Sequence, residues 1–344
     1  MIKRLLVTLG AMLFSITVHA TDSVNILVYH HVANDTPAST TISPSGFREH
    51  LQLLRDNDVT VVPLEDALAA LRGDADIDLP DKAVAITFDD AYENIHTNAF
   101  PLLKEFDVPF TVFVATDPID QNFQEMMSWD QLRDLQDWGA TITNHSRDHD
   151  YMVRHSPLDD AWLQAMIDNI SHAQQRLTDE LGDGVPRWFA YPYGEYNESL
   201  KQALLEEDYI AFAQHSGGMN ADSDWGAIPR FAAAGVYANP ETLITKINSK
   251  PMPVNRTALP DMLTAETRPS VTVELTDTSD MSRSLNCFVD SAWVDAEWLD
   301  DTRFRVSAPD VLSDGRHRFN CTSQARSGSF FYWFSQPWLV QTDR

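Results

Sequence analysis

The strongest constraint on the fold is a regular alternation of short apolar runs and helical patterns from about residue 24 to residue 250. The run at residues 84–88 is apolar on both faces, which is typical of a strand buried inside a parallel sheet. By contrast, Phe47, Leu51 and Leu54 have helical spacing, with charged residues between them. This alternation predicts an α/β fold with a parallel sheet and helices outside it, either a barrel or an open sheet.

The same alternation continues along this part of the chain. In a barrel and in an open sheet alike, function belongs at the carboxyl ends of the parallel strands. Candidate site residues should therefore follow the strands directly. We predict strands at residues 25–29, 84–88, 110–114, 140–143, 188–191, 209–212 and 227–228, and helices at residues 47–57, 98–106, 129–138 and 157–181.

The pattern changes between residues 250 and 269, where four prolines prevent a continuous helix or central strand. Beyond these prolines we predict a small β-sandwich. The expected organisation is a first domain at residues 21–263 and a second domain at residues 264–344. The short strands predicted in the second domain lie at residues 271–275, 304–306, 316–319 and 329–334.

The C-terminal region contains both cysteines of the chain and many aromatic residues. In an exported protein, Cys287 and Cys321 are expected to form one disulfide worth about 2–4 kcal/mol, and two buried thiols are the alternative. We expect most of the aromatic side chains to form the core of the sandwich. If they were exposed, they could stack on sugar rings and make the region carbohydrate-binding. These residues are Trp293, Trp298, Phe330, Phe331, Tyr332, Trp333, Phe334 and Trp338.

The N-terminus has the organisation of a signal peptide at residues 1–20. Lys3 and Arg4 precede an apolar stretch, and Val18-His19-Ala20 is a small-x-small cleavage signal. We therefore expect an exported protein, periplasmic or released, with no membrane span once this segment is removed; an uncleaved anchor is the alternative. The formal net charge of −26 excludes a protein that wraps nucleic acid.

Two polar clusters at predicted strand ends contain metal-binding residue types. Asp89 and Asp90 are adjacent, and successive side chains at a strand end point in different directions. One carboxylate could therefore bind a metal while the other remains a free base. His145 and His149 follow another strand, and one helical turn between them would bring both imidazoles together. With a carboxylate from the neighbouring strand, they predict a two-histidine, one-carboxylate metal site with open positions.

The third cluster is the tight turn Tyr191-Pro192-Tyr193-Gly194, which follows the strand predicted at residues 188–191. Such a turn could line a sugar pocket and present a backbone N–H. Each cluster alone is common in proteins without a site of this kind. Their joint occurrence at predicted strand ends favours one shared functional site.

The three clusters resemble the first three motifs of the polysaccharide deacetylases, the NodB-homology or carbohydrate esterase 4 family, over about residues 24–250. This resemblance implies a distorted (β/α) barrel and hydrolysis of an N-acetyl group from an amino sugar. It implies that Asp89 is the general base and that the Tyr193 N–H, in the turn with Pro192, stabilises the oxyanion. The ligands that it implies for one divalent metal ion are Asp90, His145 and His149. We expect zinc, with cobalt, nickel or iron as alternatives.

The chain departs from the family pattern at two places, and other residues are therefore candidates for the missing roles. Family members commonly carry an arginine before the third motif, where this chain has Ala190, so Arg230 is the candidate substitute. Asp224-Trp225 resembles the fourth motif and makes Trp225 a candidate substrate residue. No Leu-x-His occurs late in the first domain. Instead, His30 follows the first strand, as in the branch that deacetylates poly-β-1,6-N-acetylglucosamine in biofilms, and it is the candidate general acid.

The expected reaction is metal-dependent N-deacetylation of an N-acetylglucosamine polysaccharide, with the β-1,6 polymer of a biofilm matrix as the first candidate. Asp89 must be ionised and His30 protonated, so we expect a bell-shaped dependence of rate on pH. Chitin oligomers, peptidoglycan and O-acetylated glycans are alternatives within the same chemistry. An Fe(II) oxygenase would share the ligand set, and a carbohydrate-binding protein would carry a degenerate site. Export or biofilm machinery is the candidate protein partner.

Overall fold

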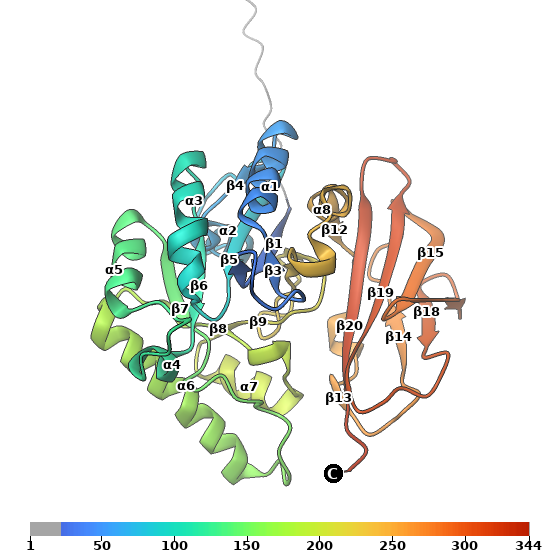
Figure 1. Ribbon diagram of the computed structural model, residues 1–344. Helices are drawn as coiled ribbons and strands as arrows, with labels where there is room; N and C mark the ends of the chain where they lie inside the picture. The colour runs from blue at the N-terminus through green and yellow to red at the C-terminus, as the bar shows by residue number, and fades with distance from the viewer. Residues whose placement is uncertain (1–21, 344) are drawn as a thin grey trace, which may run out of the picture.

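The computed structural model describes residues 22–343, and the predicted signal peptide at residues 1–20 lies outside the described residues. The chain forms two regions that lie side by side: an α/β region and an all-β region that ends at the C-terminus (Figure 1). Within residues 22–343, no helix combines the length and the apolar character that a membrane-spanning segment requires.

A nine-stranded sheet forms the centre of the α/β region. Its strands are β1 (Ser23–Tyr29), β4 (Thr60–Val61), β5 (Ala83–Phe88), β6 (Thr111–Val114), β7 (Thr141–Asn144), β8 (Trp188–Ala190), β9 (Ile210–Phe212), β10 (Gly218–Asn220) and β11 (Phe231–Ala232). Along the order β10-β1-β5-β6-β7-β8-β9, every neighbour is parallel except β10, which runs antiparallel to β1. All residues of β5 are buried, as expected for a strand that is apolar on both faces. The predicted α/β architecture is confirmed.

Helices pack around the outside of this curled sheet (Figure 1). The helix predicted at residues 129–138 forms as predicted, with its N-terminus capped by the Ser128 side chain and its end at Gly139, where φ is 113°. The helix predicted at residues 157–181 begins three residues later, because Asp159 caps its first turn. The helices are α1 (Pro44–Asp56), α2 (Leu64–Arg72), α3 (Phe100–Phe106), α4 (Thr116–Asp120), α5 (Trp129–Trp138), α6 (Asp160–Leu181), α7 (Glu198–Glu206) and α8 (Pro240–Ile247).

A short segment, residues 228–233, links the two ends of the curl. Ile228 forms a single bridge to β9, and β11 then pairs in parallel with β1. The strand predicted at residues 227–228 is therefore wrong, because the chain crosses from β9 to β1 immediately after one bridge. Arg230 lies between these two contacts and is fully buried. The crossing thus carries a guanidinium into the interior of the barrel.

The all-β region is a sandwich of two sheets, as predicted. The larger sheet has the order β12-β20-β19-β15-β16, with β13 also paired to β20, and the smaller sheet has the order β14-β18-β17. Their strands are β12 (Ser249–Pro251), β13 (Leu263–Thr264), β14 (Ser270–Glu274), β15 (Met281–Val289), β16 (Ala292–Val294), β17 (Glu297–Trp298), β18 (Arg303–Ser307), β19 (Gly315–Ala325) and β20 (Phe331–Val340). The larger sheet therefore begins before residue 264.

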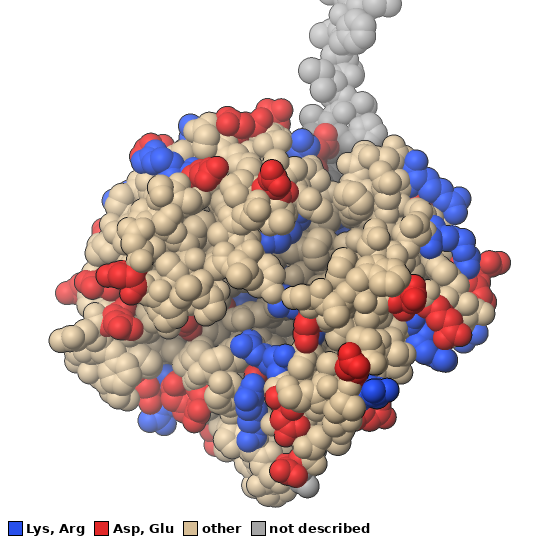
Figure 2. All heavy atoms as spheres, turned by 45° about the vertical axis from the view of Figure 1, so that its right-hand side comes forward, with Lys and Arg blue, Asp and Glu red and all other residues tan. Residues whose placement is uncertain are grey.

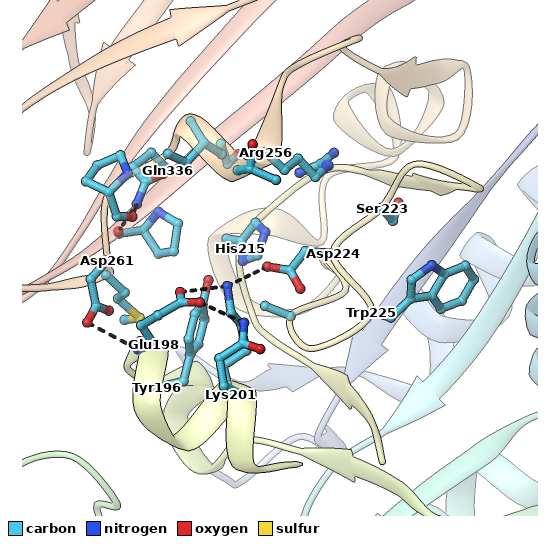
Figure 3. A pocket seen from close by; sticks show the side chains of 18 of the residues that line it. Tyr196, Glu198, Lys201, His215, Ser223, Asp224, Trp225, Arg256, Asp261 and Gln336 are labelled. Atoms are coloured by element: carbon cyan, nitrogen blue, oxygen red, sulfur yellow. Dashed lines mark hydrogen bonds and ion pairs between the residues drawn. The ribbon is translucent and has the colours of Figure 1, made fainter. Parts of the chain in front are cut away.

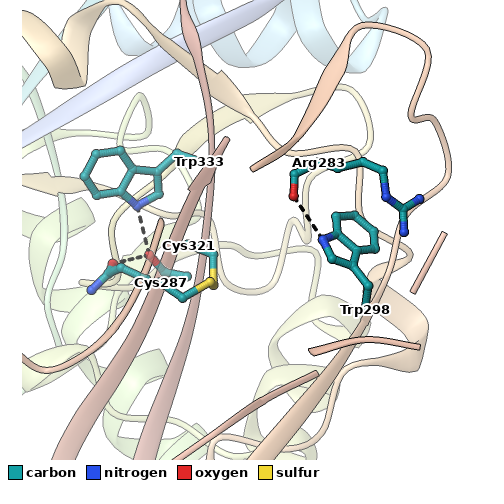
Figure 4. The surroundings of a disulfide bond; sticks show 7 residues. Arg283, Cys287, Trp298, Cys321 and Trp333 are labelled. Carbon is teal, nitrogen blue, oxygen red and sulfur yellow. Dashed lines mark hydrogen bonds between the residues drawn. A yellow bond between two sulfur atoms is a disulfide. The ribbon is translucent and has the colours of Figure 1, made fainter. Parts of the chain in front are cut away.

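The predicted disulfide is confirmed. Cys287 of β15 and Cys321 of β19 face each other in adjacent strands and are bonded, and both are buried (Figure 4). Among the eight aromatic residues singled out above, Phe334 and Trp338 are in the core of the sandwich, and Trp293 is the one that is largely exposed. The other five are partly buried. This distribution agrees with a mainly structural role for the aromatic residues.

The two regions share part of their apolar core. Leu339 of β20 and Leu263 of β13 pack in the same cluster as Phe189 and Tyr191 of the barrel. Trp333 of β20 also forms an edge-to-face contact with Phe231, with the ring centroids 5.1 Å apart. The sandwich is therefore packed against the barrel through apolar surface.

Candidate active site

Two of the predicted clusters meet beyond the carboxyl ends of β5 and β7. The Oδ1 atom of Asp90 lies 3.0 Å from Nε2 of His149 and 3.3 Å from Nε2 of His145. One potential ligand atom from each of these residues lies within 4.8 Å of the others. Because carboxylate oxygen and imidazole nitrogen are both common ligands of divalent metals, this group could hold a metal ion.

The hydrogen bonds around the group fit a bound cation. Nδ1 of His145 lies 2.7 Å from the carbonyl oxygen of Ala190 and donates to it, which leaves a lone pair on Nε2. Within residues 22–343, neither this Nε2 nor Oδ1 of Asp90 has a hydrogen-bond partner, although both atoms are buried. Two buried lone pairs that lie 3.3 Å apart repel each other, and a cation bound by both atoms, or a proton on the imidazole, would remove that repulsion. The residues present therefore fit the metal that the motifs predict.

The backbone around the group is strained. Asp90, Ser146, His149 and Tyr193 all adopt left-handed conformations, with φ between 57° and 75°. Such values are uncommon for residues other than glycine and concentrate at functional sites. The two imidazoles converge without the helical turn considered above: the Ser146 hydroxyl accepts a hydrogen bond from the His149 N–H, and Ser146 and His149 both have positive φ.

Asp89 does not join this group but forms a buried ion pair. Nη1 and Nη2 of Arg230 donate to the two carboxylate oxygens of Asp89 at 2.7 and 2.8 Å, and both side chains are inaccessible to solvent. Gln214 donates a further hydrogen bond to Oδ2 of Asp89 at 3.2 Å. Burial alone would raise the pKa of Asp89, but the neighbouring Arg230 guanidinium and the His145 imidazole hold that pKa below its usual value. The Asp89 carboxylate is therefore ionised at neutral pH.

His30 lies directly after β1, near both aspartates. Burial lowers the pKa of His30, while the charges of Asp90 and Asp89 act in the opposite direction. The ring of the next residue, His31, stacks on Tyr92 with the centroids 3.7 Å apart, and its Nδ1 contacts the Asn94 side chain.

The third motif forms a tight 3₁₀ turn, Pro192–Gly194, after β8. The Tyr193 ring contacts His149 and stacks on Tyr151, so this turn adjoins the metal-binding group. Within the described part of the chain, the Tyr193 N–H has no hydrogen-bond acceptor. The Tyr193 carbonyl accepts a hydrogen bond from Arg316 of the sandwich. The turn thus offers a free N–H donor and is fixed by a residue from the second region.

The structure does not bring Trp225 to this group. Asp90 and His149 line a cavity of about 640 Å³ together with Tyr92 and Phe123. Trp225 lies at the edge of a different cavity of about 710 Å³, between α7 and the sandwich (Figure 3). Its ring lies 5.5 Å from the Arg72 guanidinium.

Three residues near the site were not found from the sequence. Gln214 and Arg316 carry no local motif, because their roles depend on how distant segments pack. Glu195 directly follows the third motif; it is buried and accepts two hydrogen bonds from Arg154. Its proximity to that motif was the available signal.

Comparisons with known proteins agree with this geometry. Residues 76–211 match the family described as polysaccharide deacetylase. The poly-beta-1,6-N-acetyl-D-glucosamine N-deacetylase of Staphylococcus aureus is 25% identical over 216 residues, which cover 60% of this chain and 72% of that protein.

Two solved structures share the fold of the α/β region. The deacetylase PplD of Streptococcus pyogenes, in complex with acetate, has a TM-score of 0.58 at 22% identity, and IcaB of Ammonifex degensii has a TM-score of 0.57 at 24% identity. Each match covers 98% of the known chain but only 65% or 66% of this one. The family match therefore identifies a polysaccharide deacetylase domain in the α/β region of this chain, and the relatives and the shared fold indicate a deacetylase hydrolase.

Proposed function

We propose that this protein removes N-acetyl groups from poly-β-1,6-N-acetylglucosamine. The observation that carries the hydrolytic mechanism is the buried, ionised Asp89 beside a separate metal-binding group. The name of the Staphylococcus aureus relative supports the β-1,6 polymer as substrate. The early histidine His30, in place of a late Leu-x-His, supports the same branch.

A divalent ion, with zinc as our proposal, would be held by Asp90, His145 and His149, and it would polarise the amide carbonyl and acidify water. Asp89 accepts the proton of the attacking water. Its Oδ2 already accepts hydrogen bonds from Arg230 and Gln214, but its Oδ1 accepts only one, from Arg230, and keeps a second acceptor position for this proton. The free N–H of Tyr193, placed by the turn that begins at Pro192, donates to the developing oxyanion.

His30 completes the reaction by protonating the departing nitrogen, because a free amide anion is too basic to leave. The carbon–nitrogen bond then breaks, and the products are acetate and a glucosamine unit. The proton that Asp89 takes from water balances the proton that His30 supplies. Arg230 acts as a positioning residue that fixes the Asp89 carboxylate and holds it ionised.

We further propose that the protein is exported through the signal peptide at residues 1–20 and acts outside the cytoplasm. The confirmed disulfide is compatible with that location, because disulfides persist in oxidising compartments. Chitin oligomers and peptidoglycan fragments remain the substrates to compare.

The test is to incubate the zinc-loaded protein with N-acetylglucosamine pentamers of β-1,6 and β-1,4 linkage and to measure free acetate and amine. We expect the β-1,6 pentamer to have the higher kcat/KM and acetate release to stop when a chelator removes the metal. Equal amounts of acetate and amine identify an amide as the target. A higher kcat/KM for the β-1,4 pentamer would contradict the proposed linkage, and turnover that survives metal removal would contradict the mechanism.

A further inference from the structure

A cavity of about 400 Å³ lies between the barrel and strand β19 of the sandwich. The barrel contributes Tyr193, Gly194 and Gln214, and β19 contributes Arg316, His317 and Arg318. The cavity is therefore bounded by two regions that are far apart in the sequence.

This cavity adjoins the proposed reaction site. Tyr193 lines it and carries the free N–H, and its ring contacts that of His149 at a centroid distance of 4.7 Å. Gln214 also lines it and donates to Asp89. His149 in turn lines the cavity on the other side, with Asp90. A glycan whose acetamido group lies at Asp89 would thus place a neighbouring sugar against β19.

The charge of this wall differs from that of the whole chain, which is strongly acidic. Arg318 contacts the hydroxyl oxygens of Ser216 and Tyr237 at 3.4 and 3.3 Å, and within the described residues its side chain has no carboxylate partner. The one aspartate that lines the cavity, Asp290, is bonded to the His317 imidazole and to the Arg318 backbone N–H. The Arg318 guanidinium therefore faces the cavity wall without an ion-pair partner among the described residues.

The Arg318 charge contributes to lowering the pKa values of two neighbouring residues. Burial lowers the pKa of Lys246 to about 8, and the Arg318 charge contributes to that shift. Burial, with the charges of Arg256 and Arg318, lowers the pKa of His215 to about 3. Figure 2 shows Lys and Arg side chains in and beside the hollow at the centre of that view.

We propose that Arg316 and Arg318 form one wall of a second sugar subsite beside the scissile amide, and that the charge of Arg318 excludes a protonated glucosamine from this subsite. Arg316 lines the wall, but its Nε lies 3.5 Å from the buried Glu195 carboxylate, which offsets its charge. The inference rests on the proposed function, because it concerns the sugar next to the one that reacts. The enzyme would then act preferentially on units whose neighbour is still acetylated. Deacetylated units would consequently be spaced along the product.

The test compares the binding of two β-1,6 pentamers at about pH 6, where a sugar amine carries a proton. The fully deacetylated pentamer is measured with the zinc-loaded wild type and with Arg318→Gln by calorimetry. We expect Arg318→Gln to bind it about five-fold more tightly, which is the repulsion expected for two unit charges a few ångströms apart in water. Arg318→Lys, which retains the charge, should bind like the wild type. The difference should shrink at high salt.

Arg303→Gln is the matched control, because Arg303 is an exposed arginine of the smaller sheet and is paired with Asp300. It should leave both affinities unchanged. The affinity for the fully acetylated pentamer is measured with the same variants in an Asp89→Asn background, and it should change by less than about two-fold. Equal binding of the deacetylated pentamer by wild type and Arg318→Gln would overturn the inference, even if the enzyme deacetylates the polymer. If the zinc-loaded enzyme does not deacetylate the β-1,6 polymer, the proposed function is wrong. The binding comparison between wild type and Arg318→Gln still tests the charge of the subsite in that case.

Discussion

The barrel and the sandwich use charge in opposite ways. The barrel buries the Asp89–Arg230 pair completely, whereas the ion pairs within the sandwich, such as Arg283–Asp301 and Arg303–Asp300, are solvent-exposed. Buried pairs are expensive to desolvate, and replacing one by apolar residues is often neutral or stabilising. The barrel therefore carries its buried pair for chemistry, and the sandwich relies on an apolar core and one disulfide for stability.

Backbone conformation shows the same contrast. In the barrel, Asp90, Ser146, His149 and Tyr193 have positive φ at the site, while in the sandwich the described non-glycine residue with positive φ is Asp290. Strain of this kind costs about 1–3 kcal/mol per residue and persists only where the surroundings enforce it. The comparison predicts that changes in the barrel site affect turnover most, and that changes in the sandwich affect mainly stability.

The largest expected effect is on turnover. Asp89→Asn should lower kcat by about a thousand-fold, because the amide cannot accept the proton from water. Bound zinc, measured by metal analysis, should remain near one per chain, since Asp89 lies outside the metal-binding group. More than a tenth of wild-type activity in this variant would show that another residue is the base.

The next effect is on stability. Arg230→Met should lower the free energy of unfolding by about 3–5 kcal/mol, because it leaves the Asp89 carboxylate buried without a partner. The double variant Asp89→Leu/Arg230→Met should regain most of this loss and remain inactive. Urea unfolding of the three proteins measures both differences. A double variant that is less stable than Arg230→Met would mean that the pair stabilises the barrel.

Removal of the disulfide tests the other region. Cys287→Ala/Cys321→Ala should lower the unfolding free energy of the sandwich by about 2–4 kcal/mol, because the bond closes a loop with a sequence separation of 34 residues. While the protein stays folded, kcat should change by less than about two-fold. Tryptophan fluorescence during urea unfolding reports the first quantity, and acetate release reports the second. A large loss of kcat in the folded variant would remove the contrast between the regions.

The smallest effect concerns the boundary between the regions. Lys246 has a pKa of about 8 in the folded protein, against about 10.4 in an unfolded chain, so between these values the unfolded state binds more protons. The difference in unfolding free energy between the wild type and Lys246→Met should therefore rise by about 2–3 kcal/mol in favour of the wild type as pH increases through this window. In an Arg318→Gln background the rise should begin at higher pH, since one source of the pKa shift is gone. If the rise begins at the same pH with and without Arg318→Gln, then Arg318 does not lower the pKa of Lys246.

The sequence predicted those parts of the site that follow strand ends. Asp89, Asp90 and the two histidines come directly after β5 and β7, and parallel strands bring such residues to one edge. The path of the chain between the histidines was not predictable. A spacing of four residues suits a helical turn, but here the Ser146 hydroxyl accepts a hydrogen bond from the His149 N–H, and both residues have positive φ.

Residues from distant segments were harder to predict. Arg230 was only a candidate substitute, because its contact with Asp89, 141 residues away, depends on the crossing from β9 to β1. Arg316 and Arg318 carried no signal at all. The alternation of side chains in β19 gives no information about which face of the sandwich meets the barrel.

The hydrogen bond from Arg316 to the Tyr193 carbonyl has a consequence for anyone who trims this enzyme to a minimal catalyst. A fragment that stops before residue 264 would lose that tether from the turn that presents the N–H. It would also uncover the apolar surface that Leu339 now covers. Such a fragment should aggregate and turn over poorly, so the shortest useful version of this deacetylase retains residues 264–344.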